Sequence, residues 1–322
     1  MRDLDDDALP LEEAIARLAD ADPAVRQLAV LSLGELCEPA ALGPLIAALS
    51  DPDPTVRRVA VGALEELGDP RAVGPLVGVL GDPAPAVRAA ARTALREFRT
   101  PESVEPLVAG LAHPDATVRA AAVFALRERT DPRAVQPLRH ALGDPDPDVR
   151  REAVTALGYL RERGAIADLI GAARDADASV RRLALGALSF FAEASLLEVF
   201  LAALADSDWQ VRQEAAIVLG RAGDRAAAAT LVAALDDPYW QVVKEALVAL
   251  GKVRATSPAP VLKLLGHSYS EIRKVAAVTL GAMGALEAVD GLTALAEDDD
   301  IEVRKAASRA LDEIALSGRA AR

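Results

Sequence analysis

The sequence predicts an all-α protein in which roughly twenty short helices form an α–α superhelix of repeated helical hairpins. Three observations predict this fold class: a repeat of about 31 residues, an apolar pattern in each repeat that fits one helix face, and Asp-Pro pairs at the expected helix starts. The composition agrees, since 52% of the residues are apolar and only 3% aromatic, and a core of Ala, Val and Leu suits close helix packing.

An arginine marks each repeat. Steps of 31 residues from the first anchor, with one step of 30, reach ten positions, of which nine are Arg and one is Val243. The nine are Arg26, Arg57, Arg88, Arg119, Arg150, Arg181, Arg212, Arg273 and Arg304. Ala stands three residues after every anchor and Leu seven after it, so both lie on one face of an amphipathic first helix.

A second helix is expected to follow the first in each repeat. In residues 69–80, Asp69 is suited to cap a helix and Pro70 to its first position, and apolar residues then recur at helical spacing. One hairpin buries too few aliphatic side chains to offset the entropy of ordering 31 residues. The hairpins must therefore stack side by side.

This reasoning predicts a single solenoid over residues 1–322. Residues 1–20 are expected to form an N-terminal capping helix, residues 21–297 nine helical-hairpin repeats, and residues 298–322 a C-terminal capping helix.

The repeat phrase resembles a known family. Residues 51–80, DPDPTVRRVAVGALEELGDPRAVGPLVGVL, resemble the HEAT-like repeat named after phycobilisome (PBS) lyases, and the likeness recurs along nearly the whole chain. The resemblance implies an α–α superhelix. It implies less about function, because such repeats serve bilin lyases, a di-iron hydroxylase, scaffolds and many binding proteins.

Aspartates recur in the same repeats, six residues before the anchor in eight of them. Acids at these positions are suited to cap first helices and to accept hydrogen bonds from arginines between repeats, so we interpret the anchors as a structural ladder. Val243 then removes one rung, and Asp237 is expected to find water or another neighbour.

Aromatic residues gather in the C-terminal third. Trp209 and Trp240 occupy the same slot in adjacent repeats, and Tyr239 and Tyr269 replace the capping aspartate. One interpretation is an exposed stripe that anchors a partner. The other is a set of hydrophobic staples that cover the repeat junctions. A second candidate surface is the polar group around Arg139 and His140, for which a solvated patch is the alternative.

Catalytic and metal-binding patterns are missing from the sequence. The histidines His113, His140 and His267 belong to no zinc motif, the His-Glu pairs of the di-iron hydroxylases are absent, and no P-loop is present. Cys37 has no adjacent histidine and is expected to be a small buried residue. We therefore expect no enzyme activity, no cofactor and no metal.

Charge and hydropathy limit the partners. The net charge of −13 opposes binding to nucleic acid and to anionic membranes. The N-terminus lacks a secretory signal, no apolar run has membrane-spanning length, and a single cysteine fits a reducing compartment. The expectation is a soluble, cytoplasmic monomer.

The predicted function is a non-catalytic scaffold that binds a protein or peptide on the concave or edge surface of the superhelix. The alternative is an accessory, chaperone or chromophore-lyase-like factor that acts on a protein substrate, which rests on the family resemblance. DNA binding of the kind seen in DNA-alkylation-repair HEAT proteins requires a basic concave face and conflicts with the charge.

Overall fold

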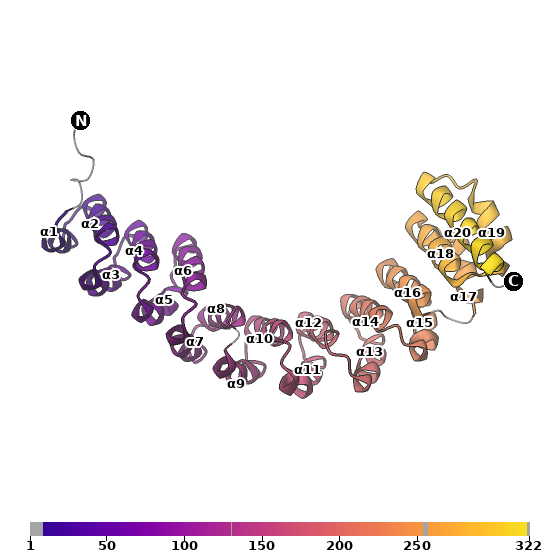
Figure 1. Cartoon of the computed structure of the whole chain (residues 1–322), viewed down its shortest axis with the longest axis horizontal. Helices are drawn as coiled ribbons and strands as arrows, with labels where there is room; N and C mark the ends of the chain where they lie inside the picture. The colour runs from indigo at the N-terminus through magenta and orange to yellow at the C-terminus, as the bar shows by residue number, and fades with distance from the viewer. Residues whose placement is uncertain (1–8, 130, 254–256, 321–322) are drawn as a thin grey trace. The chain divides into compact units, whose positions relative to one another are not determined.

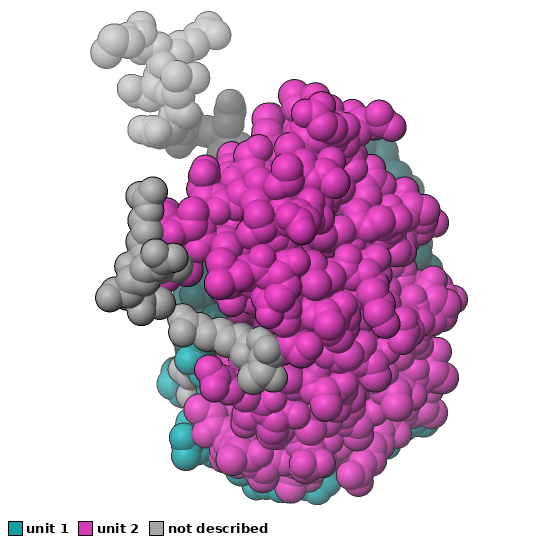
Figure 2. Space-filling model, turned by 90° about the vertical axis from the view of Figure 1, so that its right-hand side faces the viewer, with its two compact units in different colours: residues 1–165 teal, residues 166–322 magenta. Residues whose placement is uncertain are grey.

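The computed structural model describes residues 9–129, 131–253 and 257–320. Within these residues the chain forms twenty α-helices and no β-strand, which confirms the predicted fold class (Figure 1). The chain divides into two compact units, unit 1 (Met1–Ala165) and unit 2 (Ile166–Arg322), coloured separately in Figure 2.

In the described part of the chain, each unit contains ten α-helices. Those of unit 1 are α1 (Leu11–Arg17), α2 (Pro23–Leu36), α3 (Leu42–Ala48), α4 (Pro54–Leu67), α5 (Val73–Val79), α6 (Pro85–Glu97), α7 (Val104–Gly110), α8 (Ala116–Arg127), α9 (Pro132–Ala141) and α10 (Pro147–Leu160). Those of unit 2 are α11 (Ile166–Ala172), α12 (Ala178–Leu188), α13 (Leu197–Ala203), α14 (Trp209–Ala222), α15 (Ala228–Ala233), α16 (Trp240–Val253), α17 (Ala259–Leu262), α18 (Ser270–Met283), α19 (Val289–Leu295) and α20 (Ile301–Ala320).

The even-numbered helices are the predicted first helices, and the odd-numbered helices are the second. Along unit 1, α2 packs on α4, α4 on α6, and α8 on α10. Along unit 2, α12, α14, α16, α18 and α20 pack one on the next in the same way. The second helices pack on first helices, as α3 does on α4 and α13 on α14. Each unit therefore has a layer of first helices and a layer of second helices (Figure 1).

The helix starts follow the expected chemistry. The side chain of Asp53 accepts the backbone N–H groups of Thr55 and Val56 at 2.7 and 3.3 Å, and Pro54 is the first residue of α4. The same cap is made by Asp22, Asp115, Asp146, Asp177 and Asp208. The second helices differ from expectation in one respect: residues 70–72 form a 3₁₀ turn, and α5 begins only at Val73.

The core consists of the repeated Ala and Leu positions. All ten alanines that stand three residues after an anchor, from Ala29 to Ala307, are fully buried. The leucines seven residues after the anchor are buried in nine repeats, and Leu311 in α20 is half-buried. Alanine in this layer lets successive first helices approach closely.

Cys37 is exposed, so its expected burial is wrong. It is the residue that ends α2, and its backbone adopts the left-handed conformation with φ 49°. Gly68 ends α4 in the same way, with φ 65°. The position therefore projects out of the hairpin at a turn, and its side chain does not enter the core.

The predicted division into an N-terminal cap, nine repeats and a C-terminal cap stays a prediction. Helix α1 lies within the proposed N-terminal cap, and α20 within the proposed C-terminal cap. Residues 1–8 and 321–322 of these caps lie outside the described residues.

Candidate functional site

Arginine–aspartate pairs join neighbouring first helices. Between α4 and α6, the Nε and Nη2 atoms of Arg57 donate to Oδ2 and Oδ1 of Asp82 at 2.6 and 2.9 Å. Its Nη1 atom donates to the backbone carbonyls of Asp51 and Pro52, so one guanidinium fastens its own turn to the next. The same two-pronged contact joins Arg26 to Asp51, Arg119 to Asp144, Arg181 to Asp206, Arg212 to Asp237 and Arg273 to Asp298.

Contacts to the arginine's own turn are also found at three further anchors. Arg88, Arg150 and Arg304 each donate through Nη1 to the two carbonyls that stand six and five residues earlier. The slot that would hold the aspartate partner of Arg88 contains His113. Its Nδ1 accepts the backbone N–H of Asp115 at 3.1 Å, as the aspartate oxygen does in other repeats.

Hydrogen bonds from the arginines lower the pKa of their aspartate partners. Arg26, Arg57 and Arg273 hold the pKa of Asp51, Asp82 and Asp298, respectively, below its ordinary value. Carboxylates that are ionised and engaged in this way serve as structural ties and are poorly suited to exchange protons near neutral pH.

The ladder is interrupted one junction later than the sequence indicated. Asp237 is not left without an arginine, because Arg212 of the preceding repeat donates to it at 2.6 and 3.0 Å. Arg212 thus pairs forward, with the aspartate 25 residues later, as Arg57 does with Asp82. Val243 therefore removes the pair with the following turn, where His267 occupies the aspartate slot.

The four aromatic residues lie together at the first turns of α14, α16 and α18; we call this surface the aromatic edge. The ring of Trp209, at the start of α14, stacks on Tyr239 with centroids 5.5 Å apart and an interplanar angle of 11°. The ring of Trp240, at the start of α16, packs on Tyr269 at 6.2 Å and 37°. Each pair thus bridges two neighbouring repeats.

Both interpretations of the aromatics describe part of this geometry. The pairs cover repeat junctions, as staples would, yet the exposed fractions are 45% for Tyr239, 37% for Trp240 and 56% for Tyr269. Trp209 is half-buried. The rings therefore support one another and still present faces and edges to solvent.

The Trp240–Tyr269 pair lies at the junction where Val243 and His267 replace the arginine and aspartate of the ladder. His267 stacks on Tyr269 with centroids 5.5 Å apart, and its Nδ1 accepts the N–H of Tyr269 at 3.0 Å. At the first pair, by contrast, Arg212 lies over the Tyr239 ring at 5.7 Å from the centroid. Aromatic contacts thus replace an ion pair at one junction and accompany it at the other.

The polar candidates Arg139 and His140 lie on α9 in unit 1, whereas the aromatic edge belongs to unit 2. His140 is exposed, and its Nδ1 is 2.8 Å from the backbone oxygen of Gln136 one turn earlier. Arg139 is half-buried. The structure therefore brings the four aromatics together within unit 2, and these two residues belong to unit 1.

A buried arginine is a feature that the sequence analysis missed. Arg129 follows α8 and is only 6% exposed, and burial lowers the pKa of its guanidinium. It donates to the carbonyls of Leu95 and Phe98 at the end of α6, and to the hydroxyl of Ser103 at 3.1 Å. Helix α6 ends at Phe98 without a left-handed capping residue, so Arg129 supplies the missing donors.

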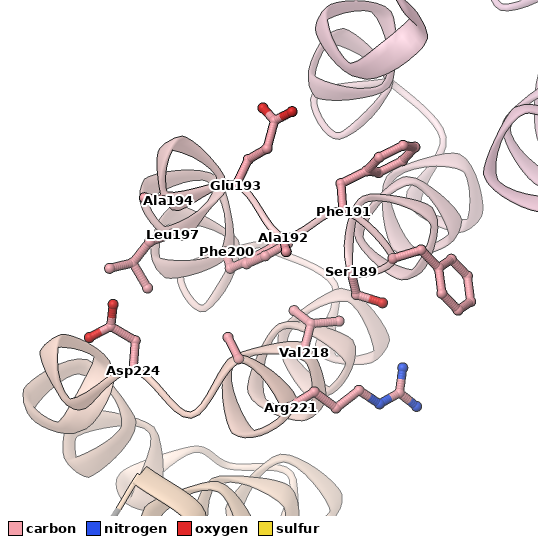
Figure 3. Close-up of a pocket in the computed structure, with 12 residues that line it drawn as sticks. Ser189, Phe191, Ala192, Glu193, Ala194, Leu197, Phe200, Val218, Arg221 and Asp224 are labelled. Atoms are coloured by element: carbon pink, nitrogen blue, oxygen red, sulfur yellow. The ribbon is translucent and has the colours of Figure 1, made fainter. Parts of the chain in front are cut away.

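A cleft of about 390 Å³ opens in unit 2 beside the end of α12 (Figure 3). Leu197 and Phe200 of α13 and Val218 of α14 contribute apolar lining, as does Phe191 after α12, and the charged side chains include Arg221. Helix α12 is 11 residues long whereas α10 and α14 have 14, and its early end leaves space at this turn.

The described residues show neither a metal site nor a membrane span. They contain no group of three or more His, Cys, Asp and Glu side chains placed to hold a metal ion. In that same part of the chain, no helix combines the length and the apolar character needed to cross a bilayer.

Known proteins share this repeat and this fold. The family model described as HEAT repeats matches residues 11–96, 75–145, 136–205, 197–266 and 258–321. An engineered protein of known structure matches with TM-score 0.53 and 22% identity, over 95% of this chain and 98% of that one. The comparison with curated proteins finds no match.

Two larger solved structures are also similar. A chain from the Kap95p–RanGDP complex matches with TM-score 0.64 and 15% identity, over 95% of this chain and 51% of that one. Importin beta matches with the same score and identity, over 94% and 52%. The chain spans about half the length of these two proteins, and at such identities the likeness concerns the fold alone.

Proposed function

Because the chain belongs to the HEAT repeat family, we propose that it is a non-catalytic scaffold that holds a protein or peptide partner against an edge of its helical repeats. The observation that carries this proposal is the aromatic edge, where two stacked aromatic pairs remain partly exposed. Trp and Tyr dominate the binding energy of protein interfaces, because they bury much area and lose little conformational entropy.

The packing of the rings favours binding as well as stability. Trp209 and Trp240 each begin a helix and each lean on a tyrosine of the next repeat, so their rotamers are restrained before a partner arrives. A surface that is already ordered loses less side-chain entropy on association. The Kap95p–RanGDP structure shows a protein of this fold engaged with another protein, which agrees with a scaffold role.

The proposal also covers the class of partner, the oligomeric state, the location and a second surface. The net charge of −13 favours a protein partner over nucleic acid or an anionic membrane. A monomeric state, a cytoplasmic location, and a second contact surface at Arg139 and His140 belong to the same proposal.

Affinity purification with a matched variant tests this function. The variant Trp209→Ala/Trp240→Ala/Tyr269→Ala is expected to lose one protein that the wild type retains, while its thermal unfolding changes little. Tyr159→Ala is the control, because Tyr159 is 65% exposed but lies on α10 in unit 1. Retention of every partner by the triple variant, or the same loss with Tyr159→Ala, would contradict the proposal.

An accessory or chromophore-lyase-like role is the alternative, and it rests on the resemblance of residues 51–80 to PBS lyase repeats. Co-expression with a bilin pathway distinguishes the two functions. A bilin absorbance band that copurifies with the chain would favour the lyase-like role.

A further inference from the structure

The cations of the aromatic edge are already engaged within the chain. Arg212 and Arg273 each bind an aspartate of the next repeat, and Lys274 pairs with Glu271 at 2.5 Å. At the neighbouring turn, Lys305 pairs with Glu302 at 2.8 Å. These positive charges are largely neutralised from within the protein.

Several carboxylates at the same turns have no such partner. Asp236, Glu297 and Asp299 are exposed, and within the described residues their side chains make no hydrogen bond or ion pair. Asp236 lies three residues before Tyr239, and Asp299 belongs to the turn that follows the repeat of Tyr269. The aromatic edge is thus flanked by exposed negative charge.

The two aromatic pairs differ in one respect that bears on the ligand. The Tyr239 ring already faces a guanidinium, that of Arg212, at 5.7 Å. The next repeat has Val243 in this slot, and no cation of the described residues lies over Trp240 or Tyr269. The first pair therefore shows what the second pair lacks, a cation over its ring.

We propose that the aromatic edge binds an arginine- or lysine-rich peptide segment of the partner, with one cation of that segment over the Trp240–Tyr269 pair. This inference rests on the proposed function and names the chemistry of its partner. The electron-rich ring faces attract the cation, and Asp236 and Asp299 pair with its neighbours. An acidic segment at this edge would leave these carboxylates facing like charge.

Tryptophan fluorescence reports binding at this surface directly, because the only two tryptophans of the chain, Trp209 and Trp240, both belong to it. A twelve-residue peptide of alternating Arg and Ser is titrated into the full chain, with Glu/Ser and Gln/Ser peptides of equal length as controls. The Arg/Ser peptide alone is expected to change the emission saturably, and its apparent Kd is expected to rise with salt.

A pair of charge variants separates local from general attraction to an acidic protein. Asp236→Asn/Asp299→Asn is expected to raise the apparent Kd about two- to fivefold for each lost contact. Glu287→Gln/Asp290→Asn removes the same charge from exposed positions at the start of α19 and is expected to leave the Kd unchanged. Both variants alter only exposed side chains, so folding is retained.

A variant that restores the missing Arg–Asp pair tests whether the peptide's cation binds over the Trp240–Tyr269 pair. The double variant Val243→Arg/His267→Asp recreates the pair found at other junctions, such as Arg212–Asp237, and supplies an internal guanidinium near Tyr269. We expect it to fold and to weaken binding of the Arg/Ser peptide about three- to tenfold.

Three results would overturn the inference: equal binding of the three peptides, equal effects of the two charge-variant pairs, or unchanged affinity after the ladder is restored in a folded protein. None of these results would contradict the scaffold function, which is tested separately by the loss of a partner from the Trp209→Ala/Trp240→Ala/Tyr269→Ala variant.

Discussion

The guanidinium of Arg57 and the carboxylate of Asp82 form a two-pronged ion pair that joins α4 to the turn before α6, with both side chains close to fully buried. The same arginine also donates to two carbonyls of its own turn. One arginine side chain therefore joins the turn before its own helix to the turn before the next first helix.

Removal of this arginine should weaken its junction. Arg57→Ala leaves the buried carboxylate of Asp82 with the backbone N–H of Ala84 but without its arginine, and is expected to lower the free energy of unfolding by about 2–3 kcal/mol. Arg58→Ala is the matched control, because the adjacent Arg58 is exposed; its expected change is within about 0.5 kcal/mol. Urea unfolding followed by circular dichroism measures both. Equal midpoints for the two variants would refute a structural role of the ladder.

The contribution of the pair should depend on pH. The hydrogen bond from Arg57 lowers the pKa of Asp82 in the folded chain below the unfolded value of about 3.9. Its stabilisation is therefore complete above about pH 4 and is lost as the pH falls through the folded-state pKa. Burial raises the pKa of Glu152 and Glu214, which acts in the opposite sense.

The comparison of wild type with Asp82→Asn isolates the one group. Their difference in unfolding free energy should be constant from pH 7 to about pH 5 and should shrink below about pH 4. A difference that stays the same at pH 3 would show that the charge of Asp82 does not stabilise the junction.

For the stability of a variant at Arg129, the structure and the repeat pattern predict opposite changes. Other repeats carry an apolar residue at this position, such as Leu67, so Arg129→Leu looks like a stabilising return to the pattern. The structure predicts instead a loss of about 2–3 kcal/mol, because the carbonyls of Leu95 and Phe98 lose their buried donor. Hydrogen exchange at the end of α6 should accelerate in the variant. An increase in stability would contradict this account of the α6 terminus.

Two glycines should respond in opposite directions to alanine. A Cβ atom on Gly220 of α14 would lie 3.0 Å from the backbone of Ala249 in α16, so Gly220→Ala is expected to destabilise by about 1–2 kcal/mol despite its better helix propensity. Gly78 of α5 has open space around it, and Gly78→Ala should stabilise by up to about 1 kcal/mol. Thermal unfolding measures both variants, and a stabilising Gly220→Ala would mean that the helices are not in close contact there.

Much of the repeat architecture follows from the sequence because helical periodicity records which face is buried. The alanine and leucine columns and the Asp caps of the first helices are all recognisable in this way. The exceptional position of Arg129 was also open to detection, since an arginine replaces an apolar residue in an otherwise regular column. The exposure of Cys37 required knowledge of its backbone, because only φ 49° reveals the turn.

The sequence by itself determined that helical hairpins repeat, where they begin, and which side chains form the core, because these properties depend on residues close together in the chain. The tertiary structure decided that an arginine of the ladder pairs with the following repeat, as Arg212 does with Asp237, and that Trp240 packs on Tyr269. Such contacts depend on how neighbouring hairpins pack across the junction. The periodic Arg and Asp columns indicate that repeats are tied together, but they do not indicate which neighbouring repeat each side chain reaches.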